Sequence, residues 1–296
     1  MSTDERLGSV AFLGLGVMSG GMAANAVAAG FQVRTWNRTP REPIAGATAA
    51  GTIAAAVEGA DIVIVCVTDD AAVRSIVLGD RGVLQARPEG AVVVDCSTTA
   101  PATAQALEAE LAKAGIGFVD APVTGGAEGA REGRLTFLCG GAEGALARAE
   151  PVLSRLGSRV LRFGGAGAGQ LAKAVNQVML AGIFLGVAEG LALAKAAGLD
   201  AEQVVDALSA GAASSWVLSA RGPFMARDDY PPEGRVALHH KDLGIAIEAM
   251  RALGIDLPGA RMVHGLEQRL VDSGRGDLDV SSVHLAVREA AANPDT

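Results

Sequence analysis

A lysine and two amide side chains fall within one helical turn near the middle of the sequence. Lys173, Asn176 and Gln177 are three and four residues apart, so a helix places them on one face. Their neighbours are strongly apolar, and loss of water around a lysine lowers its pKa, which makes it a workable proton donor near neutral pH. A lysine at a helix start can also extend its ammonium group to solvent, and the residues alone leave both roles open.

A hydroxyl and two adjacent glycines follow the apolar residues 116–119. Thr124 offers a side-chain donor, and Gly125 and Gly126 offer backbone N–H groups that no side chain shields. Such a loop suits a small carboxylate. An ordinary proline- and glycine-containing loop fits the same residues equally well.

A third polar segment, 95–99, follows the apolar run 91–94 and contains Ser97 and Thr98. Hydroxyl groups at the carboxyl end of a parallel strand face the crevice where ligands bind. The same residues could instead cap the helix expected at 102–114.

The apolar run 10–13 ends in a glycine-rich turn that opens directly into an alanine-rich helical pattern. Gly14 permits a tight strand-to-helix turn, and Gly16 lets a pyrophosphate approach the helix N-terminus. This is the setting of a dinucleotide-binding fingerprint, although Ser19 stands at its third position in place of glycine.

The end of the second expected strand indicates which dinucleotide binds. An acidic residue usually follows this strand and binds the adenosine ribose, but here the chain reads Asn37, Arg38, Thr39. Arg38 can pair with a 2′-phosphate, and its neighbours can donate hydrogen bonds to it. The sequence therefore predicts NADP as cofactor, with NAD still possible because arginine can also stack on adenine; a solvated loop arginine is the alternative interpretation.

Short apolar runs alternate with alanine-rich helical patterns through the first half of the chain. Several runs are apolar throughout, as expected for strands covered on both faces of a parallel sheet. The alternation predicts an α/β Rossmann-type doubly wound sheet. The expected strands are 9–13, 32–36, 61–67, 91–95, 116–120, 135–139 and 159–163, and the expected helices are 18–29, 71–77, 102–114 and 143–156.

The strand patterns stop at the glycine-rich segment 164–169, and the rest of the chain is helical in pattern. We therefore expect a dinucleotide-binding domain at 1–164 and an all-α domain at 165–296. The expected helices of the second domain are 168–197, 201–210, 214–220, 237–253, 258–273 and 279–291.

Composition excludes several classes of partner. The 296-residue chain has a net charge of −8, which argues against nucleic acid. Its most apolar helix has an uninterrupted apolar run only from 178 to 188, too short for a bilayer, so we expect a core helix and no membrane partner. The four histidines lack metal-ligand spacing, so no metal is expected.

Two features favour a cytoplasmic location. The polar residues 1–6 do not form the apolar segment of a signal peptide. Cys66, Cys96 and Cys139 lie in or beside apolar runs without pair spacing, which indicates buried free thiols in a reducing compartment.

Together these motifs and the segment 241–243, Lys-Asp-Leu, resemble the β-hydroxyacid dehydrogenase family over nearly the whole chain. The resemblance implies that Lys173 is catalytic, that Asn176 orients the substrate and that the Thr124 loop binds its carboxylate. It also places Thr98 and Lys241 near the nicotinamide. The predicted substrate-binding residues are Thr124, Gly125, Gly126 and Lys241. The predicted cofactor contacts are Gly14, Leu15, Gly16, Val17, Met18, Asn37, Arg38, Thr39, Val67, Thr68, Thr98 and Lys241.

Two positions depart from the family pattern. Ser19 replaces the usual glycine and adds a side chain in the first turn of the helix. Thr124 replaces the usual serine, so it keeps the hydroxyl and adds a methyl group that narrows the pocket. Neither change removes a group that the chemistry needs.

The resemblance implies an NAD(P)-dependent oxidoreductase that interconverts a small β-hydroxy acid and its semialdehyde. The segments 212–218 and 237–243 favour tartronate semialdehyde (2-hydroxy-3-oxopropionate) as substrate. The alternatives are 3-hydroxyisobutyrate and glyoxylate or succinic semialdehyde. An imine reductase is less favoured because that branch has another residue at the lysine position, and a non-catalytic NADP-binding regulator is disfavoured by the intact Lys173 and Asn176 pair.

Three further expectations concern the second domain. Its apolar helices suggest a homodimer or homotetramer. Trp216 and Phe224 are expected near the pocket or a partner subunit, with core packing as an equal alternative. His239 and His240 are expected on the surface or at a contact between domains, with substrate contact as the minor alternative.

Overall fold

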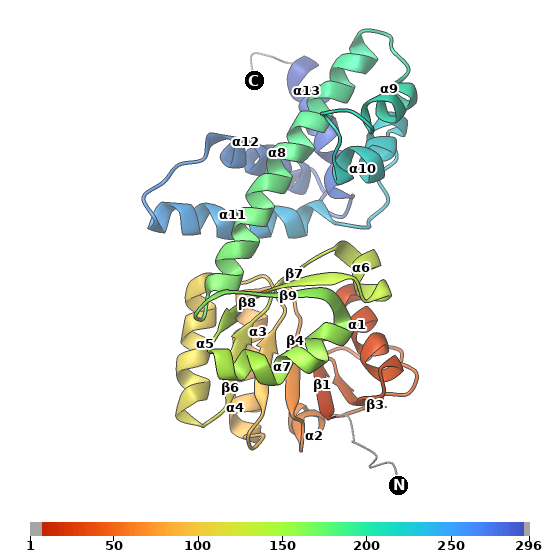
Figure 1. Ribbon diagram of the computed structural model, residues 1–296. Coiled ribbons are helices and arrows are strands. Elements are labelled where there is room, and N and C mark those ends of the chain that lie inside the picture. The colour runs from red at the N-terminus through yellow and green to blue at the C-terminus, as the bar shows by residue number, and fades with distance from the viewer. Residues whose placement is uncertain (1–7, 293–296) are drawn as a thin grey trace. The chain divides into compact units, whose positions relative to one another are not determined.

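The structure is a computed structural model that describes residues 8–292. Residues 1–6, on which the expectation about a signal peptide depends, lie outside the described residues. The chain forms two compact units that divide at Lys173 and Ala174. The division falls inside α8 (Ala168–Ala196), the long green helix of Figure 1.

A nine-stranded sheet forms the centre of the first unit. Its first six strands are parallel in the order β3-β2-β1-β4-β5-β6, and β8 then pairs antiparallel with both β6 and β7. Strand β9 pairs in parallel with β8. The strands are β1 (Ser9–Leu13), β2 (Gln32–Trp36), β3 (Thr48–Ala49), β4 (Ile62–Val65), β5 (Val92–Asp95), β6 (Gly117–Asp120), β7 (Val123–Thr124), β8 (Leu135–Gly141) and β9 (Gly157–Gly164).

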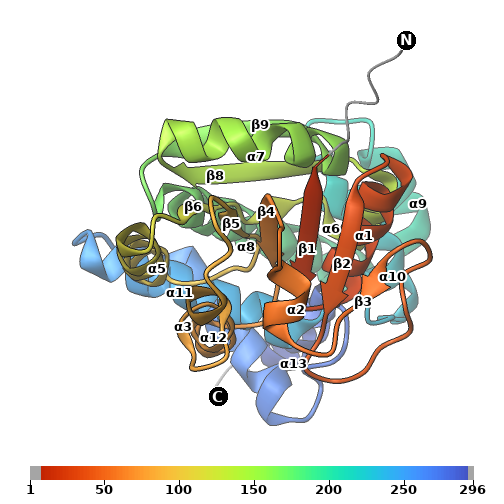
Figure 2. The ribbon, with the colours of Figure 1, turned by 90° about the horizontal axis from the view of Figure 1, so that it is seen from below.

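Helices cover both faces of this sheet, which explains why several of its strands are apolar throughout. Val10 and Phe12 of β1 face one core with Met22 and Leu153, whereas Leu13 faces a second core on the opposite side. Figure 2 shows α7 on one side of the row of strands and α2 and α3 on the other. The helices are α1 (Val17–Ala28), α2 (Ile53–Val57), α3 (Asp70–Leu78), α4 (Val83–Ala86), α5 (Pro101–Lys113), α6 (Gly126–Glu132) and α7 (Glu143–Leu156).

The sheet order places a switch point beside β1. From β1 the chain proceeds to β2 on one side and later returns to β4 on the other. Ligands of doubly wound sheets bind at the carboxyl ends of the strands at such a point. The glycine turn directly after β1 therefore lies where a dinucleotide is expected.

The second unit is helical and has its own core. Phe184 and Leu191 of α8 pack there with Leu243, Val263 and other apolar side chains. Besides α8, its helices are α9 (Ala201–Leu208), α10 (Trp216–Arg227), α11 (Val236–Ala252), α12 (Pro258–Asp272), the short 3₁₀ helix η1 (Val280–Ser282) and α13 (Val283–Ala292).

Helix α8 buries one face and exposes the other. Ala181 and Phe184 are buried, whereas Val175, Met179 and Leu193 are 55%, 64% and 71% exposed. The expectation of a core helix therefore holds for one face only. Among residues 8–292, α8 is also the one helix long and apolar enough to cross a bilayer, a test that core helices pass as well.

Helix α10 is longer than its sequence suggests. The pattern predicts a helix at 214–220, but the structure continues it through Pro223 to Arg227. Proline has no N–H for the carbonyl four residues earlier, which normally ends a helix. Here Met225 is fully buried, so packing of the last turn outweighs the missing hydrogen bond.

Candidate active site

The glycine turn after β1 is closed by contacts that leave no room for a side chain at Gly14. Its φ is +93°, and a Cβ there would lie 2.5 Å from the carbonyl oxygen of Cys66. Gly16 differs, because a Cβ there would meet only the Ser19 hydroxyl, at 3.9 Å. The space beside Gly16 is thus open at the start of α1, which fits a pyrophosphate held by helix N–H groups.

Ser19 closes the first turn of α1. Its side chain is fully buried, and its Oγ accepts a hydrogen bond from the Gly16 N–H at 2.8 Å. The close packing that glycine usually provides is found two residues later, because a Cβ on Gly21 would lie 2.8 Å from the Ala130 backbone of α6. The departure at position 19 is therefore accommodated within the turn.

The residues after β2 fall into two groups. Asn37 accepts a hydrogen bond from the Leu15 N–H at 2.9 Å and donates one to the Thr39 carbonyl at 2.6 Å, so it connects this loop to the glycine turn. Arg38 and Thr39 are exposed beside it. An exposed arginine at the end of β2, where an acidic residue usually stands, suits a 2′-phosphate.

The segment after β5 does not cap α5. Ala100 is the N-cap of that helix and makes no side-chain hydrogen bond to it. Instead, the Ser97 hydroxyl accepts a hydrogen bond from the Val67 N–H at 2.9 Å, which joins the ends of β4 and β5. Thr98 is half-buried beside it, and Thr68 donates to Asp69 at 2.9 Å.

A buried carboxylate and an amide attach the start of α8 to the ends of β5 and β6. Asp120 accepts hydrogen bonds from the N–H groups of Gly167 and Gln170, at 2.8 and 2.9 Å. The Gln170 side chain in turn accepts from the Thr99 N–H at 3.1 Å and donates to the Ser97 carbonyl at 2.9 Å. These roles were not predicted, because only the fold brings the partners together.

Lys173 lies one turn further along α8 and is buried. It is 9% exposed, and its Nζ donates a hydrogen bond to the Val123 carbonyl at 3.0 Å. The alternative in which this lysine extends to solvent is therefore wrong. Val123 directly precedes Thr124, so the lysine nitrogen lies beside the loop predicted to bind a carboxylate.

That loop adopts a conformation that requires glycine. Gly125 and Gly126 have φ of +127° and +66°, and both are exposed. Thr124 is half-buried in β7 immediately before them. The backbone N–H groups of the two glycines are thus unshielded by side chains.

In the helical unit, Asn176 and Lys241 belong to one hydrogen-bonded group with Gln177 and Asp242. Gln177 contacts Asn176 and Asp242, and Lys241 forms an ion pair with Asp242 at 2.9 Å. The sequence predicts that Gln177 shares a helix face with Lys173, but it does not indicate a hydrogen-bond partner for Gln177. Asp242 was noted only as part of a motif.

The two histidines before Lys241 both contact residues of α12. His239 is buried and lies 2.6 Å from the carboxylate of Glu267, which is fully buried in α12. His240 stacks on His264 with ring centres 3.9 Å apart. The surface interpretation is therefore wrong for His239, whereas His240 is half-buried beside α12.

Trp216 is 56% exposed, so core packing does not explain it. The guanidinium group of Arg221 lies over the rings of both Trp216 and Phe224, 4.9 and 5.1 Å from their centres.

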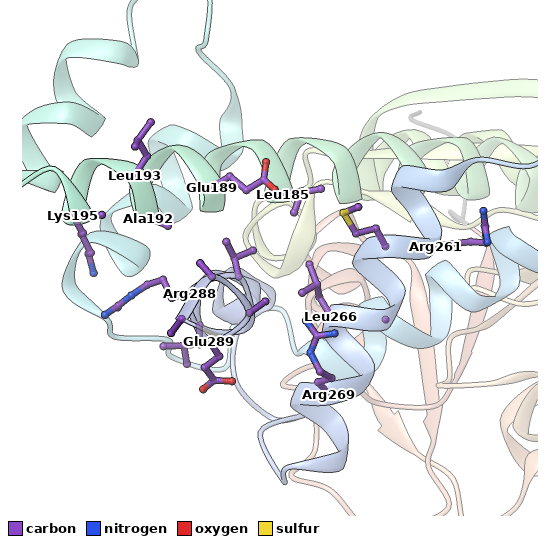
Figure 3. A pocket seen from close by; sticks show the side chains of 18 residues that line it. Leu185, Glu189, Ala192, Leu193, Lys195, Arg261, Leu266, Arg269, Arg288 and Glu289 are labelled. Carbon is purple, nitrogen blue, oxygen red and sulfur yellow. The ribbon is translucent and has the colours of Figure 1, made fainter. Parts of the chain in front are cut away.

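An open groove of about 1340 Å³ lies in the helical unit between α8, α12 and α13 (Figure 3). Leu193 and Met262 contribute apolar surface, and Arg261, Arg269 and Arg288 contribute positive charge. Among the described residues, its lining includes none of the predicted site residues.

The sheet, the glycine turn and the lysine beside a glycine loop define an NAD(P)-dependent oxidoreductase. Residues 9–165 match the family model described as the NAD binding domain of 6-phosphogluconate dehydrogenase. Residues 167–287 match the model described as NAD-binding of NADP-dependent 3-hydroxyisobutyrate dehydrogenase. The chain belongs to the β-hydroxyacid dehydrogenase family, as its sequence motifs predicted.

Similar proteins cover nearly the whole chain. It is 34% identical to 2-hydroxy-3-oxopropionate reductase of Escherichia coli, over 95% of this chain and 97% of that protein. It is 35% identical to 3-hydroxyisobutyrate dehydrogenase of Pseudomonas aeruginosa, over 94% and 98%. A solved structure of Mycobacterium tuberculosis 3-hydroxyisobutyrate dehydrogenase with L-serine is 32% identical, with a TM-score of 0.85 over 95% of this chain and 99% of that chain.

Proposed function

We propose that this protein reduces a small semialdehyde carboxylic acid to the corresponding β-hydroxy acid with NADPH, and that 2-hydroxy-3-oxopropionate is its substrate. The observation that carries the proposal is the placement of Lys173. Its buried nitrogen donates to the Val123 carbonyl, and Val123 directly precedes Thr124, Gly125 and Gly126 in the chain. A carboxylate held by that loop has a proton donor next to it.

The chain's own residues carry the acid–base part of the reaction. A nicotinamide cofactor, when bound, would supply the hydride for the aldehyde carbon. The Lys173 ammonium group gives its proton to the carbonyl oxygen, so a hydroxyl forms and the lysine is left neutral. The Thr124 loop holds the carboxylate, and Asn176 orients the reacting group.

The cofactor contacts follow from the glycine turn and the loop after β2. The open space beside Gly16 receives the pyrophosphate, and Arg38 pairs with the 2′-phosphate. We expect Arg38→Ala to raise the KM for NADPH by about tenfold and to leave the KM for NADH within twofold. Equal changes for both cofactors would contradict the role of Arg38.

A spectrophotometric screen tests the proposed function. NADPH and NADH oxidation are followed with tartronate semialdehyde, methylmalonate semialdehyde, succinic semialdehyde and glyoxylate. We expect the highest kcat/KM with tartronate semialdehyde and NADPH. A preference for methylmalonate semialdehyde would assign 3-hydroxyisobutyrate instead, and no turnover of any of the four would overturn the proposal.

We further propose a cytoplasmic homodimer or homotetramer. The exposed apolar face of α8, with Val175, Met179 and Leu193, supports self-association. Cys66, Cys96 and Cys139 are free thiols, which suits a reducing compartment, and burial raises the pKa of Cys66 and Cys139 to about 12, so these two stay protonated. Light scattering coupled to gel filtration measures the assembly, and a monomer at all concentrations would contradict it.

A further inference from the structure

Four side chains form one continuous hydrogen-bonded chain between α8 and α11. The Asn176 Nδ2 donates to the Gln177 Oε1 at 2.7 Å, and the Gln177 Nε2 donates to the Asp242 Oδ2 at 3.0 Å. The Asp242 Oδ1 lies 2.9 Å from the Lys241 Nζ. Gln177 connects Asn176 to Asp242 in this series of hydrogen bonds, and it is 5% exposed.

The chemistry of these groups allows only one direction of donation. An ionised carboxylate can only accept hydrogen bonds, so Gln177 must present its NH₂ group to Asp242. Its carbonyl oxygen then faces Asn176, which must present its own NH₂ group. The Asn176 carbonyl oxygen is therefore directed away from Gln177, where it can accept a hydrogen bond from another group.

We propose that Gln177 is a positioning residue that fixes the orientation of the Asn176 amide and connects it, through Asp242, to Lys241. The inference rests on the proposed function, in which Asn176 orients the substrate. A fixed carbonyl acceptor favours a substrate that carries a hydroxyl donor. Gln177 thus contributes to the choice between the hydroxyl group of tartronate semialdehyde and the methyl group of methylmalonate semialdehyde.

The first test replaces Gln177 by methionine, which fills a similar volume but neither accepts from Asn176 nor donates to Asp242. We expect kcat/KM for tartronate semialdehyde to fall about tenfold, while the value for methylmalonate semialdehyde changes less than threefold. A merely structural role lowers both values equally. An unchanged ratio of the two would overturn the proposal.

Gln268 provides a matched control in the same unit. Its Nε2 donates to the Asp272 Oδ1 at 2.7 Å, so Gln268→Met also breaks a glutamine–aspartate hydrogen bond, but on the exposed surface of α12. We expect both kcat/KM values of Gln268→Met to stay within twofold of the wild type.

A second variant, Gln177→Glu, uses pH to test the hydrogen bonds that Gln177 makes with Asn176 and Asp242. A protonated carboxyl group accepts from Asn176 and donates to Asp242, as the amide does. When it ionises, the donor is lost and a second negative charge faces Asp242. We expect kcat/KM for tartronate semialdehyde, relative to the wild type, to fall as pH rises from about 5 to about 8. If the ratio of kcat/KM in Gln177→Glu to that in the wild type does not change with pH, the proposed direction of the hydrogen bonds is wrong.

An NMR measurement does not depend on turnover. The side-chain amide signals of Asn176, assigned by their loss in Asn176→Ala, are expected to shift in Gln177→Met and to stay unchanged in Gln268→Met. Unchanged signals in Gln177→Met would overturn the positioning role even if the screen finds no substrate. Conversely, the wild type could fail to reduce any of the four carbonyl acids while the Asn176 signals still shift in Gln177→Met. That pair of results would overturn only the proposed function.

Discussion

The two units of this protein position their functional groups by different means. The first unit uses backbone geometry: Gly14 and Gly125 adopt conformations that favour glycine, and Asp120 binds backbone N–H groups at the start of α8. The helical unit uses pairs of side chains, among them Gln177 with Asp242 and His239 with Glu267. Backbone positioning leaves glycine motifs in the sequence, whereas side-chain pairs become visible only in three dimensions.

The largest effect on activity is expected from replacing Lys173, the last residue of the first unit. Lys173 and Lys195 both lie on α8 and both donate to a backbone carbonyl, Lys173 to Val123 at 3.0 Å and Lys195 to Met225 at 2.8 Å. We expect Lys173→Ala to lower kcat by about 10²–10⁴-fold because the proton donor is lost, while NADPH binding persists. Lys195→Ala should leave kcat within twofold. Stopped-flow kinetics and fluorescence titration measure both, and unchanged turnover in Lys173→Ala would remove its catalytic role.

The next largest effect is expected on stability, from replacing Gly169 of the first unit. A Cβ on Gly169 would lie 2.3 Å from the Leu138 carbonyl oxygen and 2.7 Å from that of Asp120. We expect Gly169→Ala to lower the free energy of unfolding by about 3 kcal/mol, because rigid backbone must move. Gly165 has open space around it and serves as the control. Urea denaturation measures both variants, and equal stabilities would show that the start of α8 is not tightly packed.

A pH-dependent effect is expected from a buried carboxyl group. Burial raises the pKa of Asp95 to about 7, above its usual value, which the unfolded chain retains. Between these two values the folded protein holds a proton that the unfolded chain releases, so the free energy of unfolding falls as pH rises. Asparagine cannot ionise, and its oxygen can still accept from the Ser97 N–H, as Asp95 does at 3.0 Å.

We therefore expect Asp95→Asn to gain about 1–2 kcal/mol of stability relative to the wild type between about pH 5 and about pH 8. Denaturation at both pH values measures this difference. A difference that does not change with pH would show that Asp95 is ionised in the folded protein.

The smallest effect tests the exposed face of the helical unit. Gly186 lies in α8 with open space around it, as Gly20 does in α1. Alanine has a higher helix propensity than glycine. In a monomer, Gly186→Ala and Gly20→Ala should therefore each raise the free energy of unfolding by about 0.5–1 kcal/mol. If a second copy packs on α8, Gly186→Ala alone should lose stability in a way that depends on protein concentration. Thermal unfolding over a range of concentrations distinguishes the two outcomes.

Much of the first unit could be predicted from sequence because its strands are covered on both faces. The run at 62–65 is apolar at every position, which marks a central parallel strand, and β1 and β5 were predicted in the same way. Strand β2 was predicted from a short β-branched run in which buried positions alternate with exposed or half-buried ones. The two-residue strands β3 and β7 and the short helices α2, α4 and α6 were missed. They are too short to show a period of apolar residues.

The site divides in the same way. Lys173, Thr124 and the glycine turn could be proposed from the sequence because their residue types and spacing suit the expected chemistry. The contacts of Gln170 with Ser97, and of His239 with Glu267, join residues far apart in the chain. No local pattern encodes such pairs, so the burial of His239 was predicted wrongly.

Helices α1 and α6, which follow the two candidate binding loops of the first unit, are in direct contact. Gly21 of α1 lies against the Ala130 backbone of α6, and the Asn25 side chain donates to the Ala130 carbonyl at 2.9 Å. Helix α6 begins at Gly126, in the carboxylate loop, and α1 begins at the cofactor turn. The two helices are therefore packed together, so under the proposed function a shift of α1 on dinucleotide binding would be expected to move the Thr124 loop as well.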